Sequence, residues 1–253
     1  MNFETENIEF KRQFTEELYK EVIAFANTDG GIIYIGMDND GDIFEEMRSI
    51  NQDLTFDAAA VSFKKYGVDF GTEKYRTLGI TQVSNQFTNL ALLLSDQCRH
   101  TIKVAVFGDE SKTVFMDNKE FTGSVFKQLE NTFNYLQLCN KTAATFKGLE
   151  RIEKQDYPEE AIREALLNAI VHRDYSFSGS IILNVNDNEM EFVSIGGLLP
   201  GLSPGDIRSG ISQPRNHNLA EIFHRLHLIE SYGTGIRKIY HLYQQCAGQP
   251  LKY

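Results

Sequence analysis

The pattern of hydrophobic and polar positions predicts helices and strands that are mixed along the chain. Apolar residues at helical spacing mark the helices, and β-branched runs between turn residues mark the strands. Helices are predicted at residues 15–26, 57–66, 122–138 and 219–229, from about Pro158 onward, and after the turn at 233–235. Strands are predicted at residues 32–35, 101–107, 113–116, 149–153, 178–185 and 189–195. This mixture indicates an α+β fold.

The helix that begins near Pro158 carries two separate stripes of residues. Proline suits the first helical position, and the two glutamates after it suit the positive end of the helix dipole. The core stripe consists of Ile162, Leu166, Ala169 and Arg173. The polar stripe consists of Glu164, Asn168 and His172, which recur every four residues. This polar stripe is either an ordinary solvated face or a binding surface that presents a carboxylate, an amide and an imidazole in register.

Three segments after this helix complete the candidate site. A predicted hairpin turns at residues 186–188, and the loop that follows it contains Gly196 and Gly197. Residues 213–218 lead into the amphipathic helix at 219–229. The run Gly233-Thr234-Gly235 then opens a last helix, where backbone N–H groups and the helix dipole can receive phosphate oxygens. The simpler alternative is that this glycine run is only a helix cap.

The Glu-x3-Asn-x3-His pattern resembles the N-box of the GHKL ATPases, and the order of the later segments is similar to the GHKL-like carboxy-terminal domain of the RecG-related regulators. The resemblance implies a GHKL-like α/β sandwich, a mixed sheet with helices on one face, that binds ATP and Mg. It implies that Asn168 ligates the magnesium and that Glu164 is the catalytic residue that positions or deprotonates the attacking water. An amide oxygen one turn from a carboxylate suits magnesium, which takes few ligands from protein. Further cofactor-binding residues implied by the resemblance are His172, Ser194, Gly196, Gly197, Gly233, Thr234 and Gly235.

Ser194 departs from the GHKL pattern. Typical members carry an aspartate there, which accepts a hydrogen bond from the adenine amino group, whereas this chain has Ser194-Ile195-Gly196-Gly197. A serine hydroxyl is neutral and shorter than a carboxylate, so weak or altered nucleotide preference is expected. His172-Arg173-Asp174 also imitates the catalytic loop of protein kinases, but that loop needs an asparagine where Gly179 stands.

The amino-terminal residues carry a second pattern, a helix followed by the turn Asn27-Thr28-Asp29-Gly30-Gly31 and a strand. This phrase resembles the Schlafen-type AlbA-like module, which implies a DNA partner. The likeness stops near residue 43, and about forty residues rarely bury enough apolar surface to fold alone. Such a piece must pack on the rest of the chain, pair with another chain or stay loosely ordered, and the second of these makes a homo-oligomer one expected state. The predicted organisation is a partial AlbA-like module at 1–43, a smaller connecting α/β region at 44–120 and the GHKL-like domain at 121–253.

Composition narrows the class of protein. The chain has 253 residues, 42% of them hydrophobic, which suffices for a sizeable core. A formal net charge of −10 argues against a protein that coats nucleic acid along its whole surface. Three cysteines without metal or redox spacing, an acidic start unlike a signal peptide, and short apolar runs predict a cytoplasmic protein without a membrane partner.

These patterns predict a DNA-associated transcriptional regulator whose GHKL-like domain binds a nucleotide with magnesium and gates a conformational change. Two alternatives stay open, a working ATPase and a scaffold that has kept the fold and lost the ligand. The sequence has no Gly-x4-Gly-Lys-Ser/Thr loop, so a helicase is not expected. A protein kinase is not expected either, because Gly179 stands where its catalytic loop needs an asparagine.

Overall fold

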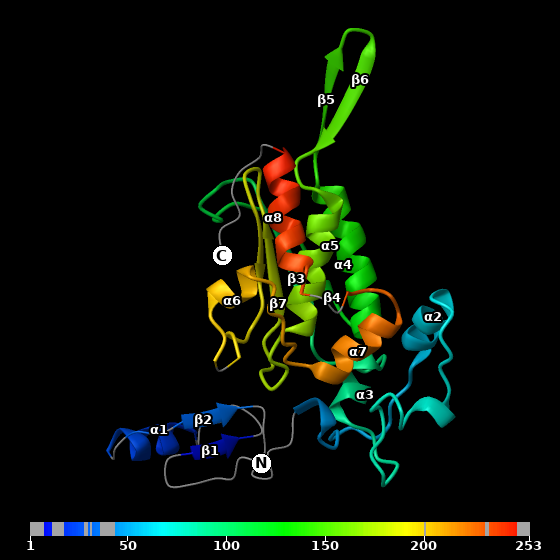
Figure 1. Ribbon diagram of the computed structural model, residues 1–253, viewed down its shortest axis with the longest axis vertical. Helices are drawn as coiled ribbons and strands as arrows, with labels where there is room; N and C mark the ends of the chain where they lie inside the picture. Colours follow the sequence, from blue (N-terminus) through cyan, green and yellow to red (C-terminus); the bar gives the residue numbers. More distant parts are fainter. Residues whose placement is uncertain are drawn as a thin grey trace.

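The computed structural model describes residues 8–11, 18–27, 30, 32–35, 44–199, 201–230 and 233–246 (Figure 1). Two predicted features lie partly outside these residues, namely the start of the first helix at 15–17 and most of the turn at 27–31. No helix in the described part of the chain has both the length and the apolar character needed to cross a membrane.

A four-stranded mixed sheet forms the centre of the fold, in the order β4-β3-β7-β8. Strand β3 (Ile102–Phe107) pairs antiparallel with β4 (Phe115–Phe121) and parallel with β7 (Ile181–Val185), which pairs antiparallel with β8 (Met190–Val193). Alternate residues of β3 and β7 are buried, while Lys103 and Ile182 between them are exposed. One face of the sheet therefore supports the core, and the predicted α+β fold is confirmed.

Helices cover the buried face of the sheet. The helix with the polar stripe, α5 (Glu159–Val171), contacts both α4 (Val125–Cys139) and α8 (Gly235–Cys246). Shorter helices complete this part of the chain: α2 (Asp57–Lys65), α3 (Asn89–Leu94), α6 (Pro204–Arg208), α7 (His217–Arg225) and the 3-10 turns η1 (Phe44–Glu46) and η2 (Thr72–Lys74). The predicted helices and the hairpin at 178–195 are confirmed within a few residues at their ends.

Aromatic rings join segments that are far apart in sequence into one core. The Phe126 ring of α4 lies 5.9 Å from that of Phe63 on α2 and 5.6 Å from that of Phe223 on α7, measured between centroids. The central sheet likewise combines strands from both sides of residue 120, the predicted domain boundary. Residues of the predicted connecting region and of the GHKL-like domain thus share one hydrophobic cluster.

Glu45, in the first turn of this core region, caps helix α7. Its carboxylate is fully buried and accepts hydrogen bonds from the backbone N–H groups of Asn218 (2.6 Å) and Leu219 (3.1 Å). Carboxyl oxygens at a helix N-terminus satisfy N–H groups that have no partner within the helix. A residue 173 positions upstream of Asn218 therefore holds the start of α7 in place.

The amino-terminal residues form a β-α-β unit. Strand β1 (Ile8–Lys11) and β2 (Ile32–Ile35) pair in parallel, and helix α1 (Leu18–Ala26) lies between them in sequence. The helix and the second strand confirm the predicted pattern, whereas the first strand was not predicted. Four residues are too few to show a clear alternation.

A β-hairpin, here called the arm, is inserted between α4 and α5 and projects away from the helices (Figure 1). It consists of β5 (Thr142–Lys147) and β6 (Glu150–Gln155) in antiparallel register. The buried Asn140 side chain ties its base together, because its amide donates to the Tyr157 carbonyl (2.8 Å) and accepts from the Tyr157 N–H (3.0 Å). Only β6 was predicted, since the Thr-Ala-Ala-Thr start of β5 lacks a distinct apolar pattern.

Candidate functional site

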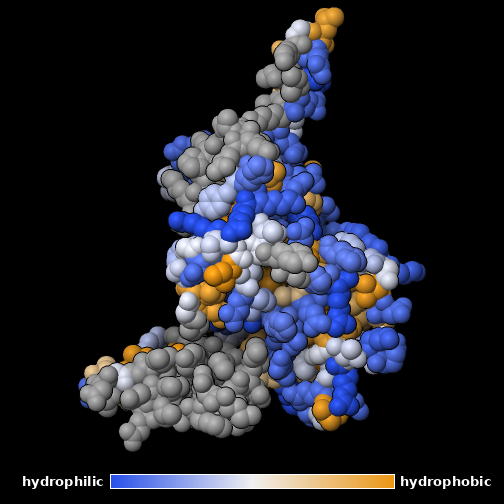
Figure 2. Space-filling model, in the orientation of Figure 1, coloured by the Kyte–Doolittle hydropathy of each residue, from blue (hydrophilic) through white to orange (hydrophobic). Residues whose placement is uncertain are grey.

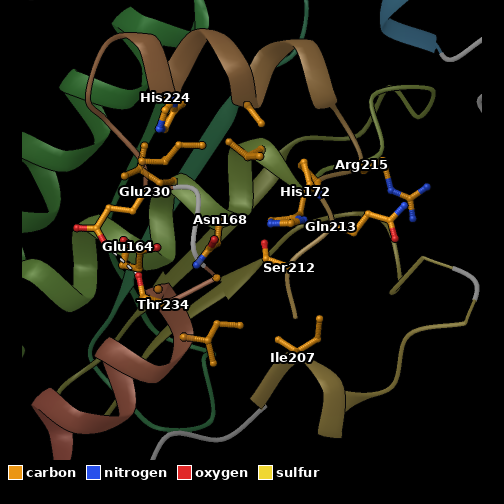
Figure 3. Close-up of a pocket in the computed structure, with 18 of the residues that line it drawn as sticks. Glu164, Asn168, His172, Ile207, Ser212, Gln213, Arg215, His224, Glu230 and Thr234 are labelled. Carbon is orange, nitrogen blue, oxygen red and sulfur yellow. Dashed lines mark hydrogen bonds between the residues drawn. The ribbon is translucent and has the colours of Figure 1, made fainter. Parts of the chain in front are cut away.

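A cavity of about 760 Å³ lies between α5, α7, the loop at 196–215 and the start of α8 (Figure 3). Such a volume lies within the usual range for small-molecule and cofactor sites. The predicted site residues that line it are Glu164, Asn168, His172, Gly196, Gly197, Gly233, Thr234 and Gly235. The polar stripe of α5 therefore borders a concave site, while Ile162, Leu166 and Ala169 are buried on the other side of the helix.

Glu164, Asn168 and His172 form a row along α5, with Thr234 at the Glu164 end and Arg215 at the His172 end (Figure 3). Burial raises the pKa of the Glu164 carboxyl and Glu230 adds to this, while Arg163 and Lys238 oppose it. Burial also lowers the pKa of His172, and the nearby Arg215 cation lowers it further. His172 is therefore neutral at pH 7, with one ring nitrogen free to accept a hydrogen bond.

Helix α8 begins against the Glu164 carboxylate. A Cβ atom built on Gly235 would overlap a carboxylate oxygen of Glu164, so a larger residue there would force the Glu164 side chain to move. One residue earlier, the Thr234 hydroxyl donates to the Glu230 carboxylate (3.0 Å). The glycine run therefore places the N-terminal end of α8 beside the first residue of the polar stripe, which is where an anionic ligand would meet free backbone N–H groups.

Gly233 holds this turn against the loop that follows α6. Its φ of +61° is in the left-handed region, and a Cβ atom would overlap the carbonyl oxygen of Gly210. The last residue of α6, just before this loop, is bound to α8 by Arg237, whose Nε donates to the Arg208 carbonyl (3.2 Å). The loop and the glycine turn thus form one wall of the cavity together.

Gly233→Ala is expected to lower the free energy of unfolding by about 2 kcal/mol, because left-handed backbone costs alanine about 1 kcal/mol and the overlap adds about as much. Urea denaturation measures the loss. Gly201→Ala is the first control, since Gly201 has φ +88° but open space around its Cβ position, so only the backbone cost applies. Gly197→Ala, which has neither constraint, should be neutral. Equal losses for Gly201→Ala and Gly233→Ala would contradict the proposed contact.

Ser194 lies just after β8 and is not one of the residues that line the cavity. Its hydroxyl donates to the Ala169 carbonyl of α5 at 2.7 Å. Two residues later, Gly196 has φ +118°, and a Cβ there would lie 3.1 Å from both the backbone N and the Cβ of Asp174. The strand end is therefore packed closely against α5 and the residues after it.

Arg215 and Asp174 form a polar contact at the rim that the predicted site does not include. Arg215 donates from Nη1 to Asp174 (3.3 Å) and from Nη2 to the Gly197 carbonyl (3.0 Å). Its Nε is buried and has no hydrogen-bond partner within the described residues. Asn216 beside it donates to the carbonyls of Val171 (2.8 Å) and Arg173 (2.7 Å), which fixes the start of α7 to the end of α5.

Helix α7 contributes a polar wall that the predicted site does not include either. His217, Glu221 and His224 line the cavity at positions i, i+4 and i+7 of this helix. The amphipathic pattern that placed Leu219, Ile222 and Phe223 in the core could have identified this opposite face. Within the described residues, no group of three or more His, Cys, Asp or Glu side chains could hold a metal ion.

Two protein-family models match parts of the chain, a Schlafen-type model at the amino-terminal end and a HATPase-like model at the carboxy-terminal end. The model described as "Putative ATP-dependent DNA helicase recG C-terminal" matches residues 179–253, and the model "Schlafen, AlbA_2" matches residues 4–113. The two matches confirm the predicted resemblance to a Schlafen AlbA-like module followed by a GHKL-like domain. The first match begins after α5, and the second runs well past residue 43.

A solved structure has a similar fold. The DIP2311 protein from Corynebacterium diphtheriae superposes with a TM-score of 0.70 over 83% of this chain, at 22% sequence identity. The match covers 45% of that protein, so the chain spans less than half its length. Among curated proteins, none matches the chain.

Proposed function

We propose that the chain is a cytoplasmic, DNA-associated transcriptional regulator whose HATPase-like part binds ATP with magnesium in the cavity and thereby gates its conformation. One observation carries this proposal. The polar stripe of α5 and the glycine turn that opens α8 border the same cavity, although about sixty residues of sequence separate them. A carboxylate, an amide and a helix N-terminus around one cavity suit a phosphorylated ligand with its metal.

The phosphates would lie at the α8 end of the cavity. Backbone N–H groups at the start of a helix bind phosphate oxygens, and α8 has twelve residues over which its dipole can build. Lys238, one turn into α8, lines the cavity and pairs with Glu160 at 3.0 Å. This cation and Arg163 add positive charge close to the glycine turn.

Asn168 would hold magnesium through its side-chain oxygen. Because no acidic cluster surrounds it in the described residues, the ion would take its other ligands from phosphate oxygens and water, as magnesium commonly does. When bound, magnesium supplies neutralisation of the phosphate charge and a bridge between the phosphates and the protein.

Glu164 would orient or deprotonate a water molecule. Its pKa is higher than that of an exposed glutamate. A carboxylate with a raised pKa takes up a proton more readily, which suits a general base. The neighbouring Arg163 lies 3.9 Å from the carboxylate, a distance that leaves this group available for water. This arrangement favours the alternative of a working ATPase.

The contact of Ser194 favours the other alternative, a scaffold without nucleotide. The Ser194 hydroxyl donates its hydrogen bond to the Ala169 carbonyl, and the residue does not line the cavity. The adenine-binding position of the GHKL pattern therefore has neither a carboxylate nor a hydroxyl that faces the cavity. We therefore propose weak discrimination between bases if a nucleotide binds. GTP should then compete with ATP nearly as well as ADP does.

The test is calorimetric titration of the chain with ATP in the presence and absence of magnesium. Asn168→Ala should weaken magnesium-dependent binding by about tenfold or more, because the metal loses its protein ligand. Asn188→Ala is the matched control, since Asn188 lies in the exposed β7–β8 turn outside the cavity.

If the wild type binds, Glu164→Gln should keep binding and lose turnover, which separates a working ATPase from a nucleotide-gated regulator. The absence of heat with the wild type at millimolar ATP would favour the scaffold. Equal affinity of the wild type and Asn168→Ala would refute the assigned metal ligand.

A further inference from the structure

The arm exposes two unpaired strand edges to solvent. Among the strands that the structure describes, β5 and β6 pair only with each other. Its tip is apolar, with Phe146 73% exposed and Leu149 fully exposed, and Figure 2 shows this hydrophobic tip at the top of the molecule. A hairpin of two strands is marginally stable in water, and its free edges are templates for another strand.

The base of the arm is nevertheless firmly fixed. Asn140 bonds to both backbone groups of Tyr157, and the Asp156 N–H donates to the Lys141 carbonyl (2.9 Å). These contacts join the two ends of the arm to the helices on either side of it. The edges are therefore presented in a defined direction, which lowers the ordering cost of pairing with a partner.

Strand β6 has a charge pattern that is complementary to itself. Its sequence is Glu150-Arg151-Ile152-Glu153-Lys154-Gln155, so residues at equal distances on either side of Ile152 have opposite charges. If a second β6 lies antiparallel with Ile152 opposite Ile152, then Arg151 stands opposite Glu153 and Glu150 stands opposite Lys154. Two-fold symmetry makes each of these pairs twice. Cross-strand pairs of opposite charge stabilise a sheet.

Neighbouring registers bring like charges together. A shift by one position places either Arg151 opposite Lys154 or Glu150 opposite Glu153. A shift by two positions places Glu153 opposite Glu153 or Arg151 opposite Arg151. Like charges directly opposite each other destabilise a sheet, so the sequence selects the register centred on Ile152. Strand β5 carries only Lys147 as a charged residue and offers no such selection.

We propose that the occupant of the β6 edge is a second copy of this chain, and that two arms pair antiparallel about Ile152 into a four-stranded sheet. In the single chain, Arg151 and Glu153 form an exposed ion pair at 2.6 Å, with their side chains 62% and 55% exposed. In the pair of chains the same residues exchange partners across the interface. This inference is independent of any ligand in the cavity.

The test is sedimentation equilibrium of the wild type and of charge-reversed variants. The wild type should be a dimer, and Arg151→Glu or Glu153→Arg alone should raise the dimer dissociation constant by about tenfold or more, because each puts like charges opposite each other twice. The double variant R151E/E153R should restore the dimer. An equimolar mixture of the two single variants should form a heterodimer, since every reversed residue then meets an opposite charge.

Lys65→Glu is the matched control, because it reverses one member of an exposed ion pair with Glu130 far from the arm in sequence. It should leave the dimer unchanged. Circular dichroism verifies that every variant is folded. A wild type that stays monomeric at about 100 µM, where a micromolar interface would be occupied, overturns the proposal. Single variants that still dimerise as the wild type does, or a mixture that fails to recover, also overturn it.

Discussion

Phe223→Ala is expected to lower the free energy of unfolding by about 3 to 5 kcal/mol, the usual cost of removing a fully buried aromatic ring. Phe223 is 0% exposed and packs on Phe126, which in turn packs on Phe63. The ring therefore connects α7 with α4 and, through it, with α2. Its loss leaves a cavity at the point where three distant segments meet.

Urea denaturation followed by circular dichroism measures this loss. If the described residues from 44 onward share one core, the transition of the variant stays single and only its midpoint moves. Phe146→Ala, at the exposed tip of the arm, removes the same ring and should change the free energy of unfolding by less than about 0.5 kcal/mol. A second transition in Phe223→Ala would show that α7 unfolds separately, contrary to a shared core.

Raising the pH from 5 to 8 is expected to destabilise the wild type by about 2.5 kcal/mol relative to Glu45→Gln. Burial raises the pKa of Glu45 from its ordinary 4.5 to about 7. The charge of Glu46 pushes it further up, whereas the backbone N–H groups of His217, Asn218 and Leu219 pull it down.

The sign follows from proton counting. Between pH 4.5 and 7 the folded chain holds a proton on Glu45 that the unfolded chain has lost. The contribution of this group to stability is therefore fully present below pH 4.5 and is lost as the pH rises through 7. Denaturation curves of the two proteins at several pH values give the difference, and the histidines common to both cancel. Parallel pH profiles for wild type and variant would show that the carboxyl titrates normally.

Local periodicity was enough to predict the longer helices, the strands of the central sheet and one wall of the site, but not β1, β5, α3 or α6. The polar stripe of α5 could be predicted because Glu164, Asn168 and His172 repeat at helical spacing. The turn before α8 could be predicted because glycine is the typical residue of tight turns. The order of these segments then indicated the fold. Each of these signals is contained within about twenty residues of sequence.

Contacts between distant residues could not be predicted in this way. Nothing in the neighbourhood of Glu45 indicates that it caps a helix 173 residues later, and Asp174 gives no sign of its contact with Arg215. The domain boundary near residue 120 was predicted from the resemblance and from the strand that leads into α5, and neither indicates that β3 pairs in parallel with β7 across it. Such contacts depend on how distant segments pack together, and a short stretch of sequence does not indicate that packing.

Because the arm is inserted between α4 and α5, its length can change without a change in the rest of the fold. Its two ends are bound together at Asn140 and Tyr157, so residues added to or removed from the strands leave the helices and the cavity where they are. Adding two residues to each strand would lengthen the arm by about 7 Å while preserving which side chains share a face. The length of the arm thus sets the distance between its tip and the cavity.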